Sequence, residues 1–378
     1  MRIEGNRMDR AFYFGLTDQS IAGKQLPFET CERILTSPEI ELLPLLDAAY
    51  QVRQKFWGKE VQIHIINNAQ NGHCSEDCGY CAQAKTSRAG IEEYSLKPDE
   101  EILAEARQAY ASGAFRYCMV FAGRGPSPRR IEKLCDLVRK IKAEHPQGEI
   151  CISAGLLNSD GAAQLKAAGL DQLNHNLNTS REKYPQICTT HTYDDRLATL
   201  HNGRAAGIHL CSGMIVGMGE LNQDIIEVAQ TLRTLGVESI PVNFLIPIEG
   251  NQMTEAKDLT PEYCLRVLCL FRFLNPQSEI RIAAGREVHL RSLEVMSLYP
   301  ANSLFLQGYL NTSGSSNVAT LQMIQDAGFT IRSRENLDDL IRKSRSFWQV
   351  RDEYASAALK SLKQLRPALP LTKVRGKY

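Results

Sequence analysis

Short apolar runs alternate with amphipathic segments from about residue 60 to residue 330, and this rhythm is typical of strands that are each followed by a helix. We read eight strands here, over residues 61–68, 116–123, 149–155, 171–178, 209–218, 238–248, 279–287 and 302–310. The segments after them have the period of helices, and several end at a glycine or proline, as helices commonly do. They cover residues 98–112, 128–145, 193–207, 260–275 and 290–299, with three more that end at Gly169, Gly236 and Gly328.

Eight strand–helix units in about 270 residues match the expected size of a closed barrel. We therefore predict an α/β fold with a (β/α)8 TIM-type barrel over residues 59–330; an open, doubly wound sheet is the alternative. Residues 1–58 and 331–378 read as a helical N-terminal extension and a helical C-terminal extension with a basic tail. In either fold, functional residues belong at the carboxyl ends of the strands and in the loops that follow.

The charge balance argues against several kinds of partner. The chain of 378 residues has 44 Lys and Arg against 43 Asp and Glu, so no global field favours nucleic acid or a membrane surface. It has no apolar run of membrane-spanning length, and its charged N-terminus lacks the apolar stretch of a signal peptide, so we expect a cytoplasmic protein. The last 19 residues contain six Lys or Arg and no acid, which favours a solvated tail over a docking or nucleic-acid segment.

The high number of cysteines, eleven, is the unusual feature of this composition. In a reducing cytosol, cysteines are metal ligands, reactive thiols or core residues more often than disulfides. Cys74, Cys78 and Cys81 lie on one short loop directly after the first predicted strand, close enough to hold one metal centre. A structural zinc site needs a fourth ligand, for which His73 is available. A four-iron cluster held by three cysteines instead leaves one iron open, which is a catalytic arrangement.

The spacing C-x3-C-x2-C after the first strand of a barrel, with Tyr80 before the third cysteine, resembles the radical S-adenosylmethionine (SAM) superfamily. The resemblance implies that Cys74, Cys78 and Cys81 hold a 4Fe–4S cluster whose open iron binds SAM, with Tyr80 next to this cofactor. One electron from the cluster splits SAM, and the resulting 5′-deoxyadenosyl radical takes hydrogen from an unactivated carbon.

Three further cysteines, Cys118, Cys151 and Cys211, fall on separate predicted strands. Because side chains alternate along a strand, each of them faces either the barrel interior or the surrounding helices. If all three face inward, they converge on one point, which Arg281 on the seventh strand can join. Cysteine is also a common core residue, so residue chemistry alone leaves both readings open.

A row of amides marks the fourth predicted strand, where Asn174, Asn176 and Asn178 alternate and therefore share one face. Buried amides need hydrogen-bond partners, so an inward row suits a ligand rich in donors and acceptors. Asn243 on the sixth strand can supply another amide. The alternative is a solvent-facing turn with ordinary asparagine caps.

Seven segments resemble one particular family within this superfamily. They are CSEDCGYCAQ, RYCM, NHNLNTS, TTHTYDDR, CSGMIVGMGE, IPVNFL and RIAAGREV, and their order and spacing resemble the biotin synthase family over nearly the whole predicted barrel. The resemblance implies that sulfur is inserted into dethiobiotin to form biotin, with SAM as cosubstrate. It implies that Cys118, Cys151, Cys211 and Arg281 hold a 2Fe–2S cluster that donates the sulfur, and no other side chain is assigned a chemical step.

The family's asparagines contact dethiobiotin and SAM. This implies a substrate role for Asn174, Asn176 and Asn243, and a cofactor role for Asn176 and Asn178. Asn178 departs from the aspartate that biotin synthases often carry at this place. Both side chains can accept a hydrogen bond from a ribose hydroxyl, but asparagine has no charge.

Two arginines are candidates for carboxylate binding. Arg196 and Arg116 suit bidentate pairing with the carboxylate of SAM or of the substrate, and we assign Arg196 to the cofactor; either can instead form a salt bridge at the barrel rim. Four other cysteines are read as structural: Cys31, Cys135, Cys264 and Cys269. Cys188, near the exit of the fourth strand, has no assigned role.

Analogy with the family adds an external electron donor, such as flavodoxin or ferredoxin, and a homodimer. Two rival functions stay open at this point. One is another radical enzyme of the biotin-synthase-like group, of the hydrogenase-maturase or pyrrolysine-pathway type, which the strand cysteines with Arg281 argue against. The other is a non-catalytic iron–sulfur or zinc-binding protein.

Overall fold

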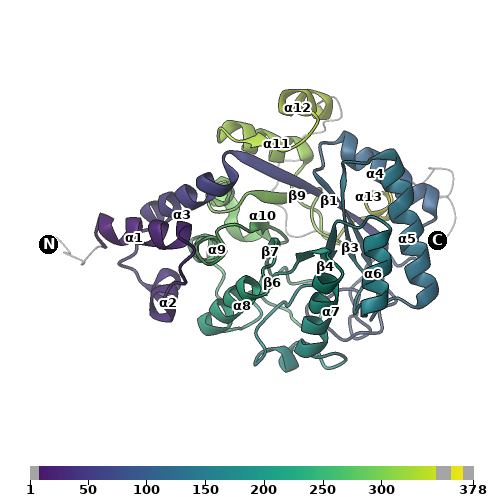
Figure 1. Ribbon diagram of the computed structural model, residues 1–378, viewed down its shortest axis with the longest axis horizontal. Coiled ribbons are helices and arrows are strands. Elements are labelled where there is room, and N and C mark those ends of the chain that lie inside the picture. The colour runs from purple at the N-terminus through teal and green to yellow at the C-terminus, as the bar shows by residue number, and fades with distance from the viewer. Residues whose placement is uncertain (1–7, 346–358, 369–378) are drawn as a thin grey trace.

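A closed barrel of parallel strands lies at the centre of the computed structural model, which describes residues 8–345 and 359–368 (Figure 1). The first strand, β1, pairs with β2 on one side and with β9 on the other, so the sheet has no free edge there. This closure confirms the predicted barrel and excludes the open sheet. The strands are β1 (Glu60–Gln70), β2 (Arg116–Phe121), β3 (Glu149–Ser153), β4 (Gln172–Asn174), β5 (His209–Cys211), β6 (Met214–Val216), β7 (Ser239–Phe244), β8 (Glu279–Ile282) and β9 (Ser303–Leu306).

The fourth and fifth positions of the barrel differ from the prediction. The expected strand over residues 171–178 keeps only three residues as β4, and the expected strand over residues 209–218 is split into β5 and β6. The chain between β5 and β6 passes very close to β7: a Cβ on Gly213 would lie 1.8 Å from the Pro241 carbonyl oxygen. Only glycine permits this approach, and the ladder breaks where it occurs.

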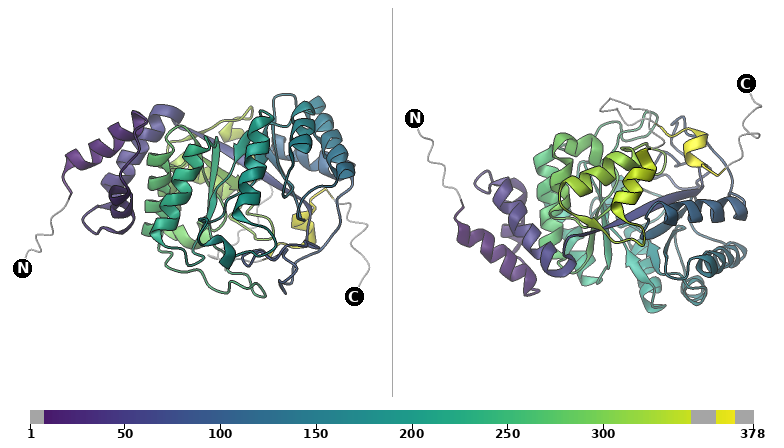
Figure 2. Two further views of the ribbon diagram at one scale, coloured as in Figure 1. Left: turned by 60° about the horizontal axis from the view of Figure 1, so that its bottom comes forward. Right: turned by 90° about the horizontal axis from the view of Figure 1, so that it is seen from above.

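Helices surround the barrel and follow the predicted order (Figure 2). One expected helix differs: residues 291–298 form a 3-10 segment, and the short α-helix before it begins within the expected strand 279–287. In α5, Ser127 caps the N-terminus by accepting from the Arg130 backbone N–H, and Pro128 occupies the first turn. Its buried residues recur every three or four positions, so one face packs on the sheet. The helices are α4 (Asp99–Ala111), α5 (Pro128–Glu144), α6 (Ser159–Ala167), α7 (Tyr193–Ala205), α8 (Asn222–Thr234), α9 (Pro261–Leu274), α10 (Arg286–Leu290) and α11 (Asn317–Asp326), with 3-10 segments η1 (Tyr184–Gln186) and η2 (Arg291–Leu298).

The N-terminal extension forms α1 (Arg10–Ile21), α2 (Phe28–Thr36) and α3 (Leu42–Trp57), which pack against the outer side of α9. This cover explains why α9 is buried on all sides from Cys264 to Leu274. After the barrel, β10 (Thr330–Ile331) pairs with the start of β1 and is followed by α12 (Leu337–Arg345) and α13 (Leu362–Leu365). The rest of the predicted helical termini, at 1–7, 346–358 and 369–378, lies outside the described residues, and so does the second half of the basic tail.

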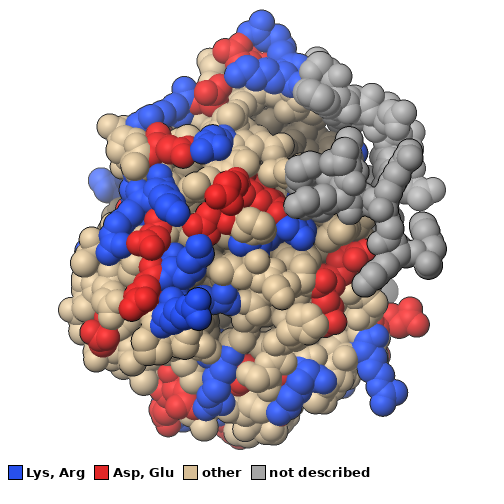
Figure 3. All heavy atoms as spheres, turned by 90° about the vertical axis from the view of Figure 1, so that its right-hand side faces the viewer, with Lys and Arg blue, Asp and Glu red and all other residues tan. Residues whose placement is uncertain are grey.

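Acidic and basic side chains are interspersed on the face shown in Figure 3, as the near-zero net charge leads one to expect. Among the helices of the described ranges, none combines the length and the apolar character needed to cross a membrane. The large hydrophobic core lies between the barrel and its helices. A second, small cluster lies apart from it and contains Cys118, Cys151, Cys211, Ala283 and Phe305.

Candidate functional site

A cavity of about 270 Å³ opens at the carboxyl ends of the barrel strands. Its wall is built from the loops after β1, β2, β3, β4, β7, β8 and β9, together with residues of β6. This is the end of the barrel at which active sites form in this fold, and the size lies near the lower end of the range for small-molecule sites.

The loop after β1 brings Cys74, Cys78 and Cys81 to this cavity. Backbone hydrogen bonds hold the loop: the Gly79 N–H donates to the Ile187 carbonyl at 2.9 Å, and the Cys81 N–H donates to the Cys78 carbonyl at 3.0 Å. Burial raises the pKa of Cys81 to about 11. The thiol is therefore protonated near neutral pH in the cluster-free protein, and metal binding must release its proton.

The donor set of this loop fits an iron–sulfur cluster better than the zinc site with His73. The His73 side chain is 61% exposed and its Nδ1 lies 3.9 Å from Glu93, away from the cavity lining. A single ion draws its ligand atoms close together, and the three loop thiols do not form such a group among the described residues within a 4.8 Å limit. In a four-iron cluster each thiolate binds a different iron, so wider spacing is expected.

Tyr80 and Asn178 connect the cysteine loop to the segment after β4. The Asn178 side-chain amide donates to the Tyr80 hydroxyl at 2.6 Å, and both residues line the cavity. Asn178 has a φ of 69°, a left-handed conformation in which asparagine is enriched. Burial raises the pKa of Tyr80 well above its ordinary value, so the phenol stays neutral.

All three alternating asparagines, Asn174, Asn176 and Asn178, line the cavity, so the row faces inward and is not a solvent-facing turn. The Asn176 side-chain oxygen accepts from the Gly213 N–H at 3.1 Å, and the Asn174 amide lies 3.2 Å from the Cys211 sulfur. Asn243 also lines the cavity, but it donates to the Met214 carbonyl and accepts from the Ala284 N–H. Its amide therefore joins neighbouring strand ends.

The two candidate arginines have different surroundings. Arg196 lines the cavity, donates to the Asn176 carbonyl at 2.8 Å, and lies 2.8 Å from the His191 Nε2 atom. Arg116 does not line the cavity; it forms a buried ion pair with Glu279 at 2.9 Å and a partly exposed one with Glu149 at 2.6 Å. Of the two, only Arg196 is placed to meet a ligand carboxylate in the cavity.

The strand cysteines Cys118, Cys151 and Cys211 meet inside the barrel, next to Arg281. Cys118 and Cys151 are direct register partners on β2 and β3, and Cys211 lies on β5 across the short β4. The nearest guanidinium nitrogen of Arg281 is 3.6 Å from the Cys211 sulfur. A hydrogen bond from Cys151 lowers the pKa of Cys211 to about 5. Burial acts in the opposite direction, and the positive charge of Arg281 lowers the pKa further. The structure thus brings together the four residues that the sequence placed on separate strands.

A buried carboxylate, Glu279, lies beside this group and was missed from sequence. It contacts Arg281 at 2.6 Å, Arg116 at 2.9 Å and His64 at 2.8 Å, and it accepts from the Ser303 hydroxyl at 2.7 Å. Burial alone would raise the pKa of Glu279, but the two guanidinium groups and His64 outweigh it and hold the pKa well below its usual range. Its position two residues before Arg281, on the same strand face, was the available signal.

His175 was missed as well, although it stands within the asparagine row. It lines the cavity, is 5% exposed, and its Nε2 atom has no hydrogen-bond partner among the described residues. Burial, and then the nearby Arg196, lower the pKa of His175 well below its usual value, so the ring is neutral. An unpaired buried polar atom costs about 1–3 kcal/mol, so a polar ligand that reaches it is stabilised.

Cys188 is the third omission, since the sequence assigned it no role. Its sulfur lies 3.8 Å from the Cys78 sulfur and 3.1 Å from the His191 Nδ1 atom. A hydrogen bond from Cys78 lowers the pKa of Cys188 to about 4, and a hydrogen bond with His191 adds to this effect. Burial acts in the opposite direction. The available sequence signal was that Cys188 and His191 are three residues apart. Their proximity to the cysteine loop arises only in the folded chain.

Comparison with known families gives two matches along the chain. The family described as the radical SAM superfamily matches residues 71–232, and the biotin and thiamin synthesis associated domain matches residues 241–330. Together they span the barrel from the cysteine loop to the last barrel helix.

Several curated relatives, each named biotin synthase, align with most of the chain. The protein from Magnetococcus marinus is 55% identical over 85% of this chain and 99% of its own length. The one from Acaryochloris marina is 54% identical over 80% of this chain and 88% of its own, and the one from Geobacillus kaustophilus is 44% identical over 84% and 95%.

Solved structures of similar fold are more distant in sequence. Methylornithine synthase aligns with a TM-score of 0.72 at 20% identity, over 86% of this chain and 98% of that chain. An FeFe-hydrogenase maturase from Carboxydothermus hydrogenoformans aligns with a TM-score of 0.72 at 17% identity, over 85% of this chain and 79% of that chain. At this identity they support the fold alone.

Proposed function

The chain belongs to the biotin synthase family of the radical SAM superfamily, and on this premise we propose how its residues divide the conversion of dethiobiotin to biotin. It is an enzyme of the radical SAM sulfurtransferase type that uses a 4Fe–4S cluster with SAM. The maturase and pyrrolysine-pathway types were the nearest rival functions, and the relatives at 44–55% identity are named biotin synthase instead.

Cys74, Cys78 and Cys81 hold the 4Fe–4S cluster in this proposal, supported by their common position at the cavity. When bound, the cluster with SAM supplies the radical that removes hydrogen from dethiobiotin. The chain's own residues place the ligands around it: Arg196 takes the carboxylate of SAM, and Asn178 with Tyr80 meets its ribose. The cavity lies inside the barrel mouth, where protein atoms replace water around reactive groups.

Dethiobiotin binds along the asparagine row. Asn174 and Asn176 supply amide donors and acceptors for the ureido ring, and His175 can pair its free nitrogen with the same ligand. Asn243 lies at the substrate wall, where it fixes the strand ends that shape the pocket. The Asn174 amide touches Cys211, so a substrate held by Asn174 lies next to the strand cysteines.

The sulfur donor is a 2Fe–2S cluster, consumed as a substrate and held by Cys118, Cys151, Cys211 and Arg281. The observation that supports this proposal is the buried meeting of three thiols and one guanidinium directly behind the asparagine row. Guanidinium is a poor metal donor, and here Glu279 also binds it. Arg281 is therefore a weak ligand at most, which suits a cluster that must give up sulfur.

An acidic electron carrier such as flavodoxin or ferredoxin, and a homodimer, complete the proposal. Support for the carrier comes from three exposed cations on the loops around the cavity mouth, Lys85, Arg88 and Arg124, of which Arg124 is also paired with Glu76. Such a group raises the encounter rate with an acidic partner at low salt. The homodimer rests on the family alone.

Iron analysis with Mössbauer spectroscopy on anaerobically reconstituted protein tests the two-cluster proposal. The wild-type chain should show two iron environments, of which Cys74→Ser removes one and Cys151→Ser removes the other. A single environment that both substitutions abolish would contradict the division into two sites. Zinc without iron would contradict the assignment of the loop.

A further inference from the structure

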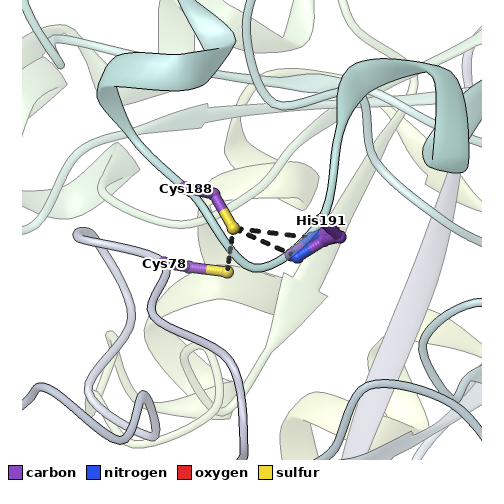
Figure 4. A group of neighbouring side chains, drawn as sticks. All are labelled: Cys78, Cys188 and His191. Atoms are coloured by element: carbon purple, nitrogen blue, oxygen red, sulfur yellow. Dashed lines mark hydrogen bonds between the residues drawn. The ribbon is translucent and has the colours of Figure 1, made fainter.

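Cys78 has a second set of neighbours besides the other cysteines of its loop. Cys78, Cys188 and His191 lie with one ligand atom each within 4.8 Å of the others, and all three residues are buried (Figure 4). Figure 4 shows Cys78 on the loop after β1, and Cys188 and His191 on the segment that leads to α7. Two distant segments thus bring two thiols and an imidazole to one point.

The spacing matches a mononuclear metal site. Bond lengths of 2.3 Å to sulfur and 2.0–2.1 Å to nitrogen at a tetrahedral centre give separations of about 3.8 Å between sulfurs and about 3.6 Å from sulfur to nitrogen. The Cys78 and Cys188 sulfurs are 3.8 Å apart, and the Cys188 sulfur is 3.1 Å from the His191 Nδ1 atom. The sulfur–sulfur distance matches, the Cys188–His191 pair must open by about 0.5 Å, and the Cys78–His191 pair lies within the 4.8 Å limit.

We propose that, in the cluster-free protein, Cys78, Cys188 and His191 bind a single thiophilic divalent cation such as zinc or ferrous iron. Thiolate and imidazole ligands suit these ions. Glu76 lies 2.8 Å from His191 Nδ1 and lines the cavity, so a carboxylate or a solvent molecule completes the tetrahedron. The site goes beyond the proposed function and shares one residue with it, since Cys78 is also a ligand of the proposed 4Fe–4S cluster.

Binding requires a defined rearrangement around the ring. The Cys78 thiol, which donates to the Cys188 sulfur, loses its proton when the ion enters. The ring now accepts at Nε2 from Arg196 at 2.8 Å; coordination at Nδ1 moves the ring proton to Nε2, so this hydrogen bond is given up. Arg196 keeps its bonds to the Asn176 carbonyl and the Tyr184 hydroxyl, and it therefore remains anchored.

Because both metal centres use the Cys78 thiolate, they cannot be occupied at the same time. An ion at this site holds the Cys78 thiolate, so the cluster cannot form with all three loop cysteines until the ion leaves. An ion that leaves slowly, such as zinc bound by two thiolates, therefore delays cluster assembly.

Cobalt(II) titration of the full-length, chelator-treated and reduced protein, under exclusion of oxygen, tests the site directly. The wild-type chain should bind one cobalt with the thiolate-to-cobalt charge-transfer intensity of two thiolates. Cys188→Ser should halve this intensity and weaken binding on the order of tenfold or more, since even supporting residues around a metal contribute tenfold. His191→Gln should keep the two-thiolate intensity and weaken binding only.

Two matched variants control for the serine substitution. Cys74→Ser removes a loop cysteine outside the group, and Cys135→Ser replaces a buried cysteine of α5. Both should bind cobalt like the wild type. Cobalt binding that is lost in Cys74→Ser and kept in Cys188→Ser would place the ion in the loop trio and overturn the proposal. Absence of thiolate-to-cobalt absorption in the wild type would overturn it as well.

A second measurement tests the exclusion. One equivalent of zinc, added before iron and sulfide, should slow cluster reconstitution in the wild type and leave the Cys188→Ser rate unchanged. Equal slowing in both would contradict the shared use of Cys78. Failure of reconstitution without any zinc would instead count against the proposed cluster, so the two ideas fail separately.

Discussion

At the scale of single residues, Glu279 holds the charges inside the barrel together. It is the shared partner of two buried arginines and His64, and removal of one member of a buried ion network leaves the others unpaired. We expect Glu279→Gln to lower the free energy of unfolding by about 3–5 kcal/mol near neutral pH. Urea denaturation of the cluster-free chain measures it, and a change below 1 kcal/mol would contradict the role of this carboxylate.

The same residue predicts a pH dependence. Its folded-state pKa lies well below the ordinary value of 4.5, so the folded state binds fewer protons than the unfolded state in acid. The stabilisation is therefore fully present above about pH 4.5 and is lost as the pH falls toward the folded pKa. The unfolding free energy of the wild type should fall more steeply below this pH than that of Glu279→Gln. Parallel slopes would show that other carboxylates carry the effect.

Asn178 offers a test of the cofactor wall. Aspartate tolerates the left-handed backbone of this position and can accept from the Tyr80 hydroxyl, so Asn178→Asp should change the KM for SAM by less than about tenfold. Asn178→Ala loses the side-chain contact, and the left-handed backbone costs alanine about 1–2 kcal/mol. We expect it to raise this KM more than Asn178→Asp does. Equal KM values for both variants would argue against contact with SAM.

Sequence reasoning at this scale found the residues that repeat or cluster locally. The loop cysteines are neighbours along the chain, and the asparagine row has the period of a strand. His191 and Cys188 could not be placed, because their link to Cys78 exists only after the chain has folded. The sequence left two roles open for Arg116, carboxylate binding and a salt bridge. Its ion pairs with Glu279 and Glu149 favour the salt bridge.

At the scale of elements, the break between β5 and β6 gives the barrel its polar wall. Gly213 lies against the Pro241 carbonyl and donates its N–H to Asn176, so a side chain there forces the strands apart. We expect Gly213→Ala to destabilise the fold by about 1–3 kcal/mol, as overpacking commonly does. Gly90→Ala is the matched control, because nothing lies within 4 Å of its added Cβ and it is exposed. Similar melting temperatures for both variants would contradict the steric account.

The segment around α13 stabilises the loop after β9, which forms part of the cavity wall. In this loop the Asn311 carbonyl accepts from the Lys360 N–H at 2.8 Å, and Thr312 forms an antiparallel bridge with Leu359. A chain that ends at residue 358 should therefore bind dethiobiotin several-fold more weakly than a chain that ends at residue 368. Calorimetric titration of both reconstituted proteins measures this, and equal affinities would show that the segment does not support the site.

Element order was predictable because the hydrophobic rhythm continues through all eight units. The short β4 and the split after β5 were not, since the apolar pattern runs on through residues whose backbone leaves the ladder to approach the cavity. The close contact at Gly213 depends on a strand that follows it by 28 residues, so no local pattern reveals it. β10 was missed because two residues are too few for a period.

At the scale of the whole molecule, the barrel places one cysteine group at the cavity and a second group deeper in its interior. The loop trio lies at the cavity, and the strand cysteines lie behind the asparagine row. This order predicts a division of labour: the outer group is needed to split SAM, and the inner group is needed to deliver sulfur. A substrate between them is within reach of both.

The most direct measurement is anaerobic incubation of reconstituted protein with dethiobiotin, SAM and a reductant, followed by quantification of biotin and 5′-deoxyadenosine. The wild type should form both products, Cys74→Ser should form neither, and Cys151→Ser should form 5′-deoxyadenosine without biotin. Biotin formed by Cys74→Ser, or no 5′-deoxyadenosine from iron-loaded wild type, would contradict the assignment of the cysteine loop.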